Sequence, residues 1–159
     1  MKVNRAFWWS MAATLAADQV SKFLVVHWLD LWSRQVIAVI PGWLKFHMAW
    51  NQGINFGLLS GSSEITRWTL IGVAIAVSIW VFSWARREPH NRVVQLSAGL
   101  LIGGALGNVI DRIAYGAVAD FLNVSIPGIR NPWSFNIADI AIFVGAFGLV
   151  LFSGRNKTP

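Results

Sequence analysis

The sequence predicts a mainly α-helical, polytopic membrane protein with four transmembrane helices and a small extracytoplasmic β-sheet. Composition is the first reason: 55% of the 159 residues are hydrophobic and only 13% are charged, about half the charged share of a typical soluble domain. The mean hydropathy of +0.54 points the same way, and ten tryptophans are numerous enough to mark both membrane interfaces. The third reason is that long apolar segments recur along the chain.

The basic character of the chain first suggests a nucleic-acid-binding protein, because the net charge is +6 and the pI is about 10.9. That class is excluded, since the basic residues form no dense run and the segments between them are too apolar to face water. The absence of cysteine excludes disulfides, thiol nucleophiles and thiolate metal sites. The length leaves room for one domain, so we expect residues 1–159 to form a single integral membrane domain.

Four segments are long and apolar enough to cross a bilayer, which takes about 20 residues. They lie at about 6–28, 65–84, 93–113 and 137–152. An even number of spans places both termini on one side, and the lysines and arginines near the termini and between the second and third spans all fall there. The positive-inside rule makes that side the cytoplasm. The connections at about 29–64 and 114–136 then face outward, away from the cytoplasm.

The outer connections are predicted to contain β-structure. Residues 36–50 mix β-branched, aromatic and polar side chains around Pro41-Gly42, a pattern that is typical of a hairpin. Residues 117–126 also contain strand-like stretches. We therefore expect a small sheet that rests on the outer surface of the bilayer.

Charged residues inside the predicted spans are the first candidates for function, because a charge in the bilayer is costly. Asp18 and Lys22 are four residues apart, so they share a helix face and can pair; a structural ion pair and a catalytic role both fit. Asn108, Asp111 and Arg112 also share one face. They either cap and pair at the outer helix end, or form a platform in which Asn108 and Arg112 donate to a peptide carbonyl. In the second case Asp111 would hold Arg112 in place.

Two acids in unusual surroundings suggest the chemistry. Asp120 has apolar residues on both sides, and Asp139 lies in the first turn of the fourth predicted helix, where the helix dipole favours a carboxylate. A surface acid and a helix-start acid are the structural alternatives. If the two carboxyls meet in a low dielectric, both cannot ionise easily, so one keeps a proton while the other acts as a base. Such a pair can activate water against an amide, and the sequence leaves open which aspartate is the base.

Other classes of site lack their motifs. The sequence contains no H-E-x-x-H, no G-x-S-x-G, no P-loop and no Rossmann fingerprint. Its three histidines lie far apart, so no zinc site is expected. The run at residues 51–57 alternates Asn and Gly with apolar residues, which fits a turn as well as a substrate contact. The glycine-rich run at residues 103–107 favours close helix packing in a membrane.

Five short elements follow one another along the chain: D-x-x-[ST]-K at residues 18–22, N-x-G-x-x-F at 51–56, G-G-x-x-G-N-x-x-D-R at 103–112, V-x-D-F at 118–121 and F-N-x-A-D at 135–139. Each element alone is weakly specific, whereas five in sequence at matching membrane positions are strongly so. In these elements, and over nearly its whole length, the chain resembles lipoprotein signal peptidase (signal peptidase II), the bacterial membrane aspartyl peptidase family.

The resemblance implies a four-helix membrane fold with a small periplasmic β-cradle, located in the bacterial inner membrane. It implies an aspartic endopeptidase that cleaves the signal peptide from diacylglyceryl-modified prolipoproteins, just before the lipidated cysteine. The implied partners are these substrates and membrane lipids, without a metal, a cofactor, nucleic acid or an obligate protein partner. By motif, the implied catalytic residues are Asp120 and Asp139. The implied substrate-binding residues are Asn51, Asn108, Arg112 and Asn136, and the implied supporting residues are Asp18, Lys22, Gly53, Phe56, Gly104 and Asp111.

The chain departs from the family pattern at Ile54 and Asn55, where the family usually has two small residues. The added bulk and polarity could narrow the site or change which residues near the lipobox cysteine are accepted. Two other functions remain alternatives. One is a small transporter or proton-coupled channel that uses the intramembrane charges, although the acids cluster toward one end of the spans. The other is a non-catalytic scaffold that packs through the third span. Closely facing carboxyls of Asp120 and Asp139 would favour the peptidase.

Overall fold

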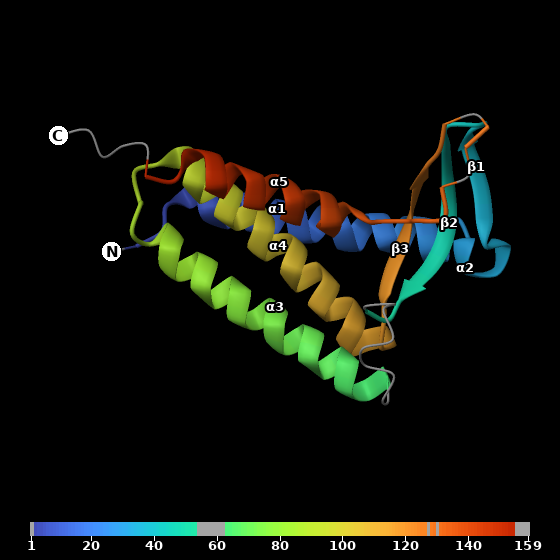
Figure 1. Cartoon of the computed structure of the whole chain (residues 1–159), viewed down its shortest axis with the longest axis horizontal. Helices are drawn as coiled ribbons and strands as arrows, with labels where there is room; N and C mark the ends of the chain where they lie inside the picture. The colour runs from blue at the N-terminus through green and yellow to red at the C-terminus, as the bar shows by residue number, and fades with distance from the viewer. Residues whose placement is uncertain (1, 54–62, 127, 130, 155–159) are drawn as a thin grey trace.

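The computed structural model describes residues 2–53, 63–126, 128–129 and 131–154 as a helical bundle with a small sheet at one end (Figure 1). The helices are α1 (Arg5–Lys22), the π-helical turn η1 (Phe23–Trp28), α2 (Leu31–Arg34), α3 (Ser63–Ala85), α4 (Arg92–Tyr115) and α5 (Ile137–Phe152). The strands are β1 (Val36–Ile40), β2 (Leu44–Asn51) and β3 (Val118–Val124). The predicted combination of a mainly helical protein with a small sheet is confirmed.

All four predicted apolar segments are helical. The first one forms α1 and continues directly into η1, and the other three match α3, α4 and α5 to within about two residues. By length and composition, α3 from Glu64 onward and α4 could each cross a membrane, whereas α5 is a shorter apolar helix. The number of crossings therefore stays a prediction.

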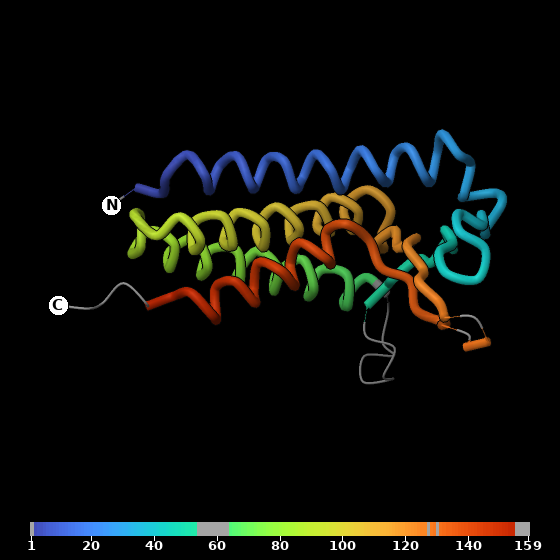
Figure 2. The backbone as a smooth tube through the Cα atoms, turned by 90° about the horizontal axis from the view of Figure 1, so that it is seen from above, coloured from blue at the N-terminus to red at the C-terminus, as the bar shows by residue number. Residues whose placement is uncertain are grey.

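Helix α4 occupies the middle of the bundle and packs against α1 on one side and α5 on another (Figure 2). Glycines allow this close approach. A Cβ atom on Gly103 would lie 2.6 Å from the backbone oxygen of Met11 in α1, and one on Gly104 would lie 2.5 Å from the backbone oxygen of Ala138 in α5. Because backbone atoms cannot move aside cheaply, only glycine fits at these two positions. The predicted packing role of the glycine-rich run is confirmed.

The sheet is antiparallel with the order β1-β2-β3, and β1 and β2 form the predicted hairpin. It lies at the end of the bundle opposite to the described chain ends (Figure 1). Gly116 ends α4 with a φ of +79°, so the chain turns at once into β3. The register between β2 and β3 shifts between Phe46 and Ala49, which places Ala49 opposite Asp120. The turn and the bulge together bring a strand acid to the end of the helices.

Large apolar side chains remain exposed on the outer helices. On α5, Phe143 and Val150 are 73% and 75% exposed, and on α3 Ile79 and Trp80 are also exposed. Apolar surfaces of this extent are unusual in a soluble monomer. They fit helices that contact lipid.

Candidate active site

Asp120 and Asp139 both lie at the sheet end of the bundle, where Asn136 contacts each of them. Asn136 is the N-cap of α5, so its side-chain oxygen accepts from the backbone nitrogen of Asp139 at 2.9 Å. In return, Asp139 accepts from the backbone nitrogen of Asn136 at 3.2 Å. The Asn136 amide also donates to Asp120 on β3 at 2.6 Å. One asparagine therefore fixes the position of both carboxyls, which we call the aspartate pair.

Two further asparagines hold one carboxyl each. Asn108 of α4 donates to Asp139 at 3.0 Å, and Asn51 at the end of β2 donates to Asp120 at 3.1 Å. Asn136 also donates to the side-chain oxygen of Asn108 at 3.2 Å. The structure thus brings three of the four predicted substrate-binding residues into direct contact with the aspartate pair.

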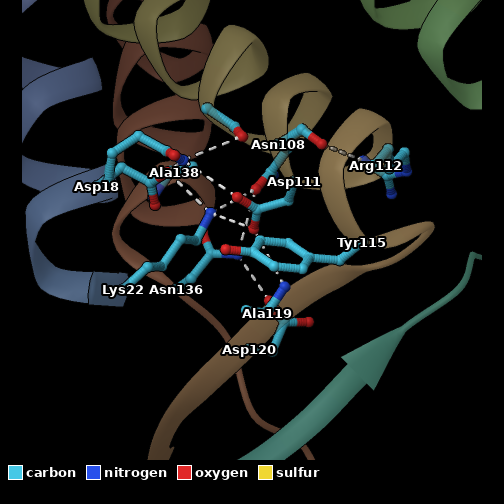
Figure 3. A network of polar contacts seen from close by, with 12 residues as sticks. Asp18, Lys22, Asn108, Asp111, Arg112, Tyr115, Ala119, Asp120, Asn136 and Ala138 are labelled. Atoms are coloured by element: carbon cyan, nitrogen blue, oxygen red, sulfur yellow. Dashed lines mark hydrogen bonds and ion pairs between the residues drawn. The ribbon is translucent and has the colours of Figure 1, made fainter. Parts of the chain in front are cut away.

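A buried ion cluster of Asp18, Lys22 and Asp111 lies beside Asp120 and Asn136 (Figure 3). The Lys22 Nζ is 2.8 Å from Asp18 and 2.8 Å from Asp111, and none of the three side chains is more than 7% exposed. Lys22 also donates to the side-chain oxygen of Asn108 at 3.3 Å, and Asp18 accepts from the backbone nitrogen of Ala138 at 3.0 Å. The predicted pairing of Asp18 and Lys22 is confirmed, and the cluster ties α1 to α4 and α5.

Of the two alternatives for this helix face, the one in which Asp111 holds Arg112 in place is wrong. Consecutive helical residues point in different directions, and Figure 3 shows Arg112 pointing away from the ion cluster. Asp111 instead pairs with Lys22 and accepts from the backbone nitrogen of Ala119 at 3.1 Å, which anchors the start of β3. Arg112 donates to the backbone oxygen of Asn108 at 3.4 Å, and its buried Nε has no hydrogen-bond partner among the described residues.

Sequence reasoning did not identify Gln19 as a site residue. Its amide donates to Asp18 at 3.1 Å, to Asp111 at 3.1 Å and to the backbone oxygen of Gly107 at 3.3 Å. Gln19 therefore holds the two carboxylates of the ion cluster at a second point, in addition to Lys22. The only signal in the sequence is its place beside Asp18, and that position alone does not indicate which face of the helix Gln19 occupies.

Two of the predicted supporting residues act through the backbone. Gly53 has a φ of +120°, a conformation that favours glycine, and its backbone nitrogen donates to the side-chain oxygen of Asn51 at 3.0 Å. That bond leaves the Asn51 amide free to donate to the aspartate pair. Gly104 gives the close contact between α4 and α5. Phe56 and the atypical residues 54–55 lie outside the part of the chain that the structure describes.

Comparison with known proteins decides the family. The sequence model of the family described as "Signal peptidase (SPase) II" matches residues 10–154. This chain belongs to the signal peptidase II family. A lipoprotein signal peptidase of Methylorubrum extorquens is 41% identical, in an alignment that covers 92% of this chain and 84% of that protein. One of Pseudomonas fluorescens is 38% identical, in an alignment that covers 98% of this chain and 92% of that protein.

The fold agrees with this family. A solved bacterial membrane enzyme, determined by the in meso method at 1.9 Å, is similar with a TM-score of 0.79 and 27% identity over 95% of this chain and 94% of that chain. A second such structure gives a TM-score of 0.76 at 26% identity over 96% of this chain and 93% of that chain. As a signal peptidase II the chain is a protease, and thus a hydrolase. Within the described residues, no group of three or more His, Cys, Asp or Glu side chains is placed to hold a metal ion.

The site of this signal peptidase II raises the pKa of Asp120 from its ordinary 3.8 to about 7. Burial is the main cause, since Asp120 is only 3% exposed, and the negative charge of Asp139 adds to it. The amides of Asn51 and Asn136, followed by the charge of Lys22, lower the pKa and limit the rise. Near neutral pH, Asp120 therefore carries a proton in a large part of the molecules. A protonated carboxyl can donate a hydrogen bond to a carbonyl oxygen.

An apolar groove of about 450 Å³ runs between α3, α4 and α5 of this signal peptidase II, where α3 diverges from α5 (Figure 1). Its walls include Val77, Trp80 and Leu149. The polar residues of its lining are Asn108 and Arg112, which lie toward the sheet end of α4. The groove thus leads along the helices toward the aspartate pair.

Proposed function

We propose that the chain is an aspartic endopeptidase that removes the signal peptide of diacylglyceryl-modified prolipoproteins by cleaving just before the lipidated cysteine. Family membership supports the action on prolipoprotein signal peptides. The observation that carries the aspartic mechanism is the bridge made by Asn136, which donates to Asp120 at 2.6 Å and also caps the helix at Asp139. A carboxyl pair held in this way is suited to activating water against an amide.

In this mechanism Asp139 is the base and Asp120 is the acid. Asp139 takes a proton from water, the water oxygen attacks the scissile carbonyl carbon, and Asp120 gives its proton to the carbonyl oxygen. When the C–N bond breaks, Asp139 passes the proton from water to the leaving amine of the lipidated cysteine. One hydroxyl of the intermediate returns a proton to Asp120, and the signal peptide leaves with a new carboxylic acid, which then loses its proton to water. The raised pKa of Asp120 supports this assignment of roles.

Arg112 and the three asparagines are proposed to position the substrate. Arg112 is the strongest candidate for direct contact, because its buried Nε has no partner among the described residues and its side chain lines the apolar groove. A guanidinium in this place can donate to a substrate carbonyl next to the scissile bond. Asn51, Asn108 and Asn136 would orient both the carboxyls and the peptide. The proposed supporting residues are Asp18, Lys22, Gly53, Phe56, Gly104 and Asp111.

The groove between α3, α4 and α5 is proposed to receive the apolar signal helix of the substrate. Its lining is apolar except near the aspartate pair, where Asn108 and Arg112 lie. A lipid-anchored substrate reaches such a groove by diffusion within the membrane plane. The scissile bond would then stop beside the two carboxyls, where water can enter from the sheet side.

We propose that residues 1–159 form one integral domain of the bacterial inner membrane, with spans at about 6–28, 65–84, 93–113 and 137–152. Both termini would be cytoplasmic, and the aspartate pair would lie at the periplasmic face. The fold supports this arrangement, because the sheet and the described chain ends lie at opposite ends of the bundle (Figure 1). The basic residues gathered at the end with the termini support the orientation.

The proposal is tested by incubating the purified protein in lipid bilayers with a diacylglyceryl-modified prolipoprotein. Mass spectrometry of the products should show a mature chain that begins at the lipidated cysteine and a released signal peptide. The matched control is the same precursor with its lipobox cysteine changed to serine, which cannot be lipidated and should stay uncut. Cleavage at another bond, or equal cleavage of both precursors, would refute the proposed specificity.

A further inference from the structure

A cleft of about 730 Å³ opens between the first turns of α1 and α4, at the end of the bundle away from the aspartate pair. Arg5 lines it from α1 and Arg92 lines it from α4, together with His90 from the connection before α4. Trp9 and Leu96 provide apolar surface in the same cleft. The lining therefore combines positive charge at the end of the bundle with apolar side chains further along the helices.

The two arginines occupy places where a positive charge is unfavourable. Arg5 is the first residue of α1 and Arg92 is the first residue of α4, and neither helix has an acidic residue in its first turn. The N-terminus of a helix carries a partial positive charge, so an acid is the stabilising residue there and an arginine is not. Two helices that both break this rule beside one cleft make the electrostatic potential there more positive. An anion in the cleft would relieve it.

Neither Arg5 nor Arg92 belongs to an ion pair in the described part of the chain. Glu88, the acid of the connection before α4, accepts from Ser153 at 2.6 Å, from the backbone of Gly154 at 3.2 Å and from the side chain of Asn91 at 3.2 Å. Its carboxylate is thus held by the residues after α5 and by the N-cap of α4, and Glu88 does not line the cleft.

The floor of the cleft is fixed by hydrogen bonds. Asn4 donates from its side chain to the backbone oxygen of Pro89 at 3.0 Å, and its side-chain oxygen accepts from the backbone of Ala6 at 2.9 Å. Gln95, which is fully buried, accepts from the backbone nitrogen of Asn4 at 3.0 Å and donates to the backbone of Ala85 at 2.7 Å. These bonds join the start of α1 to the connection before α4, so the backbone segments that carry the two arginines are fixed relative to each other.

We propose that this cleft binds the headgroup of an anionic phospholipid. The phosphate lies between the guanidinium groups of Arg5 and Arg92, which can each donate two hydrogen bonds to it. An acyl chain runs along Leu96 and Trp9, and Trp9 is 75% exposed at the depth where tryptophan favours the membrane interface. Basic pockets between transmembrane helices are known to suit such headgroups. The bound lipid would link the beginnings of α1 and α4.

The test is native mass spectrometry of the full-length protein in detergent, titrated with phosphatidylglycerol or with phosphatidylcholine of the same acyl chains. The wild type should prefer phosphatidylglycerol. Arg5→Gln and Arg92→Gln should each weaken its binding about fivefold, and the double variant about 25-fold. Arg5→Lys should keep most of the binding, because it keeps the charge. None of these changes should alter peptidase activity, so the outcome is independent of the proposed function.

Arg87→Gln is the matched control, because it removes one positive charge at the same end of the bundle from a residue that does not line the cleft. It should leave phosphatidylglycerol binding within about twofold of the wild type. An equal loss in Arg87→Gln and Arg5→Gln would show general surface attraction and overturn the site. Equal binding of the two lipids would also overturn it. Binding of free glycerol phosphate as tight as that of the lipid would overturn the role of the acyl chain.

Discussion

Asp120 is the residue on which the proposed acid–base roles depend, because the site raises its pKa to about 7 through burial and the charge of Asp139. In the proposed mechanism Asp120 must be protonated when the substrate binds. The cleavage rate should therefore be sustained below about pH 7 and fall as the pH rises through that value, as Asp120 loses its proton. A pH profile of kcat/KM with a lipidated prolipoprotein measures this. A rate that rises steadily from pH 7 to pH 9 would contradict the assignment of Asp120 as the acid.

A substitution of Lys22 tests whether the ion cluster has a structural or a catalytic role. Lys22→Met leaves the carboxylates of Asp18 and Asp111 buried without their counter-charge, and breaking a buried pair in this way costs about 3–5 kcal/mol. We expect a large fall in the thermal midpoint in detergent. Glu64→Gln is the control, because the Glu64 side chain is 62% exposed in its pair with Arg67 and its loss should cost at most about 1 kcal/mol.

The outcome for Lys22→Met distinguishes the two alternatives that the sequence left open. A destabilised protein would assign Lys22 to the structure of the site. An unchanged thermal midpoint with lost cleavage would contradict that assignment and favour a direct catalytic role. The contact between Lys22 and Asn108 at 3.3 Å connects Lys22 to the aspartate pair. The bonds of Asp18 to Ala138 and of Asp111 to Ala119 connect the rest of the cluster to it.

The residue types of the site could be predicted from the sequence, whereas their partners could not. A charged residue within an apolar segment is a candidate functional residue, and Asp18, Lys22 and Asp120 can be recognised in the sequence for this reason. The partner of Asp111 depends on which face of α4 packs against α1. This orientation is a tertiary feature that cannot be predicted from the spacing of residues along one helix. The capping role of Asn136 is readable in part from its place before α5, but its bond to Asp120 requires β3 to arrive at the same point.

At the scale of elements, the fold rests on the close contact of α4 with its neighbours. Gly103→Ala places a Cβ atom 2.6 Å from the backbone of Met11, so α1 and α4 must move apart. We expect a loss of about 1–3 kcal/mol, typical of overpacking. The thermal midpoint and the resistance to unfolding in SDS measure it.

Gly72→Ala is the matched control for this change. It lies on α3 and a Cβ atom there meets nothing within 4 Å. Alanine should be neutral or slightly stabilising at this position, because it has the higher helix propensity. Equal destabilisation by the two substitutions would show that the effect is not caused by packing between α1 and α4.

Most of the elements could be predicted from the sequence, because apolar length defines the helices and the Pro41-Gly42 turn defines the hairpin. The details that could not be predicted come from pairing between distant segments. The bulge between Phe46 and Ala49 is an example, since it depends on how β2 meets β3. The short helix α2 is another, because its four residues carry too little periodicity to be recognised.

At the scale of the whole molecule, the proposed function requires that the two ends of the helical bundle face opposite sides of the membrane. The sheet end carries the aspartate pair. The other end carries the described termini (Figure 2) and the basic residues near them. The native chain has no cysteine, so a maleimide can label only an introduced cysteine, and the labelling shows on which side of the membrane that residue lies. In intact spheroplasts, a membrane-impermeant maleimide should label Val39→Cys on β1 and should label His90→Cys only after lysis. Labelling of both without lysis, or of His90→Cys alone, would contradict the proposed orientation.

The most direct test of the central claim is the cleavage rate of the Asp120→Asn and Asp139→Asn variants with a lipidated prolipoprotein. Asp30→Asn is the control, because Asp30 is exposed and its carboxylate accepts a hydrogen bond from Ser33, away from the aspartate pair. If the aspartate pair activates water, each of the first two variants should lose about 10²–10⁴-fold in rate while remaining folded, and the control should cleave normally. Wild-type cleavage by a folded Asp120→Asn or Asp139→Asn variant would contradict the account.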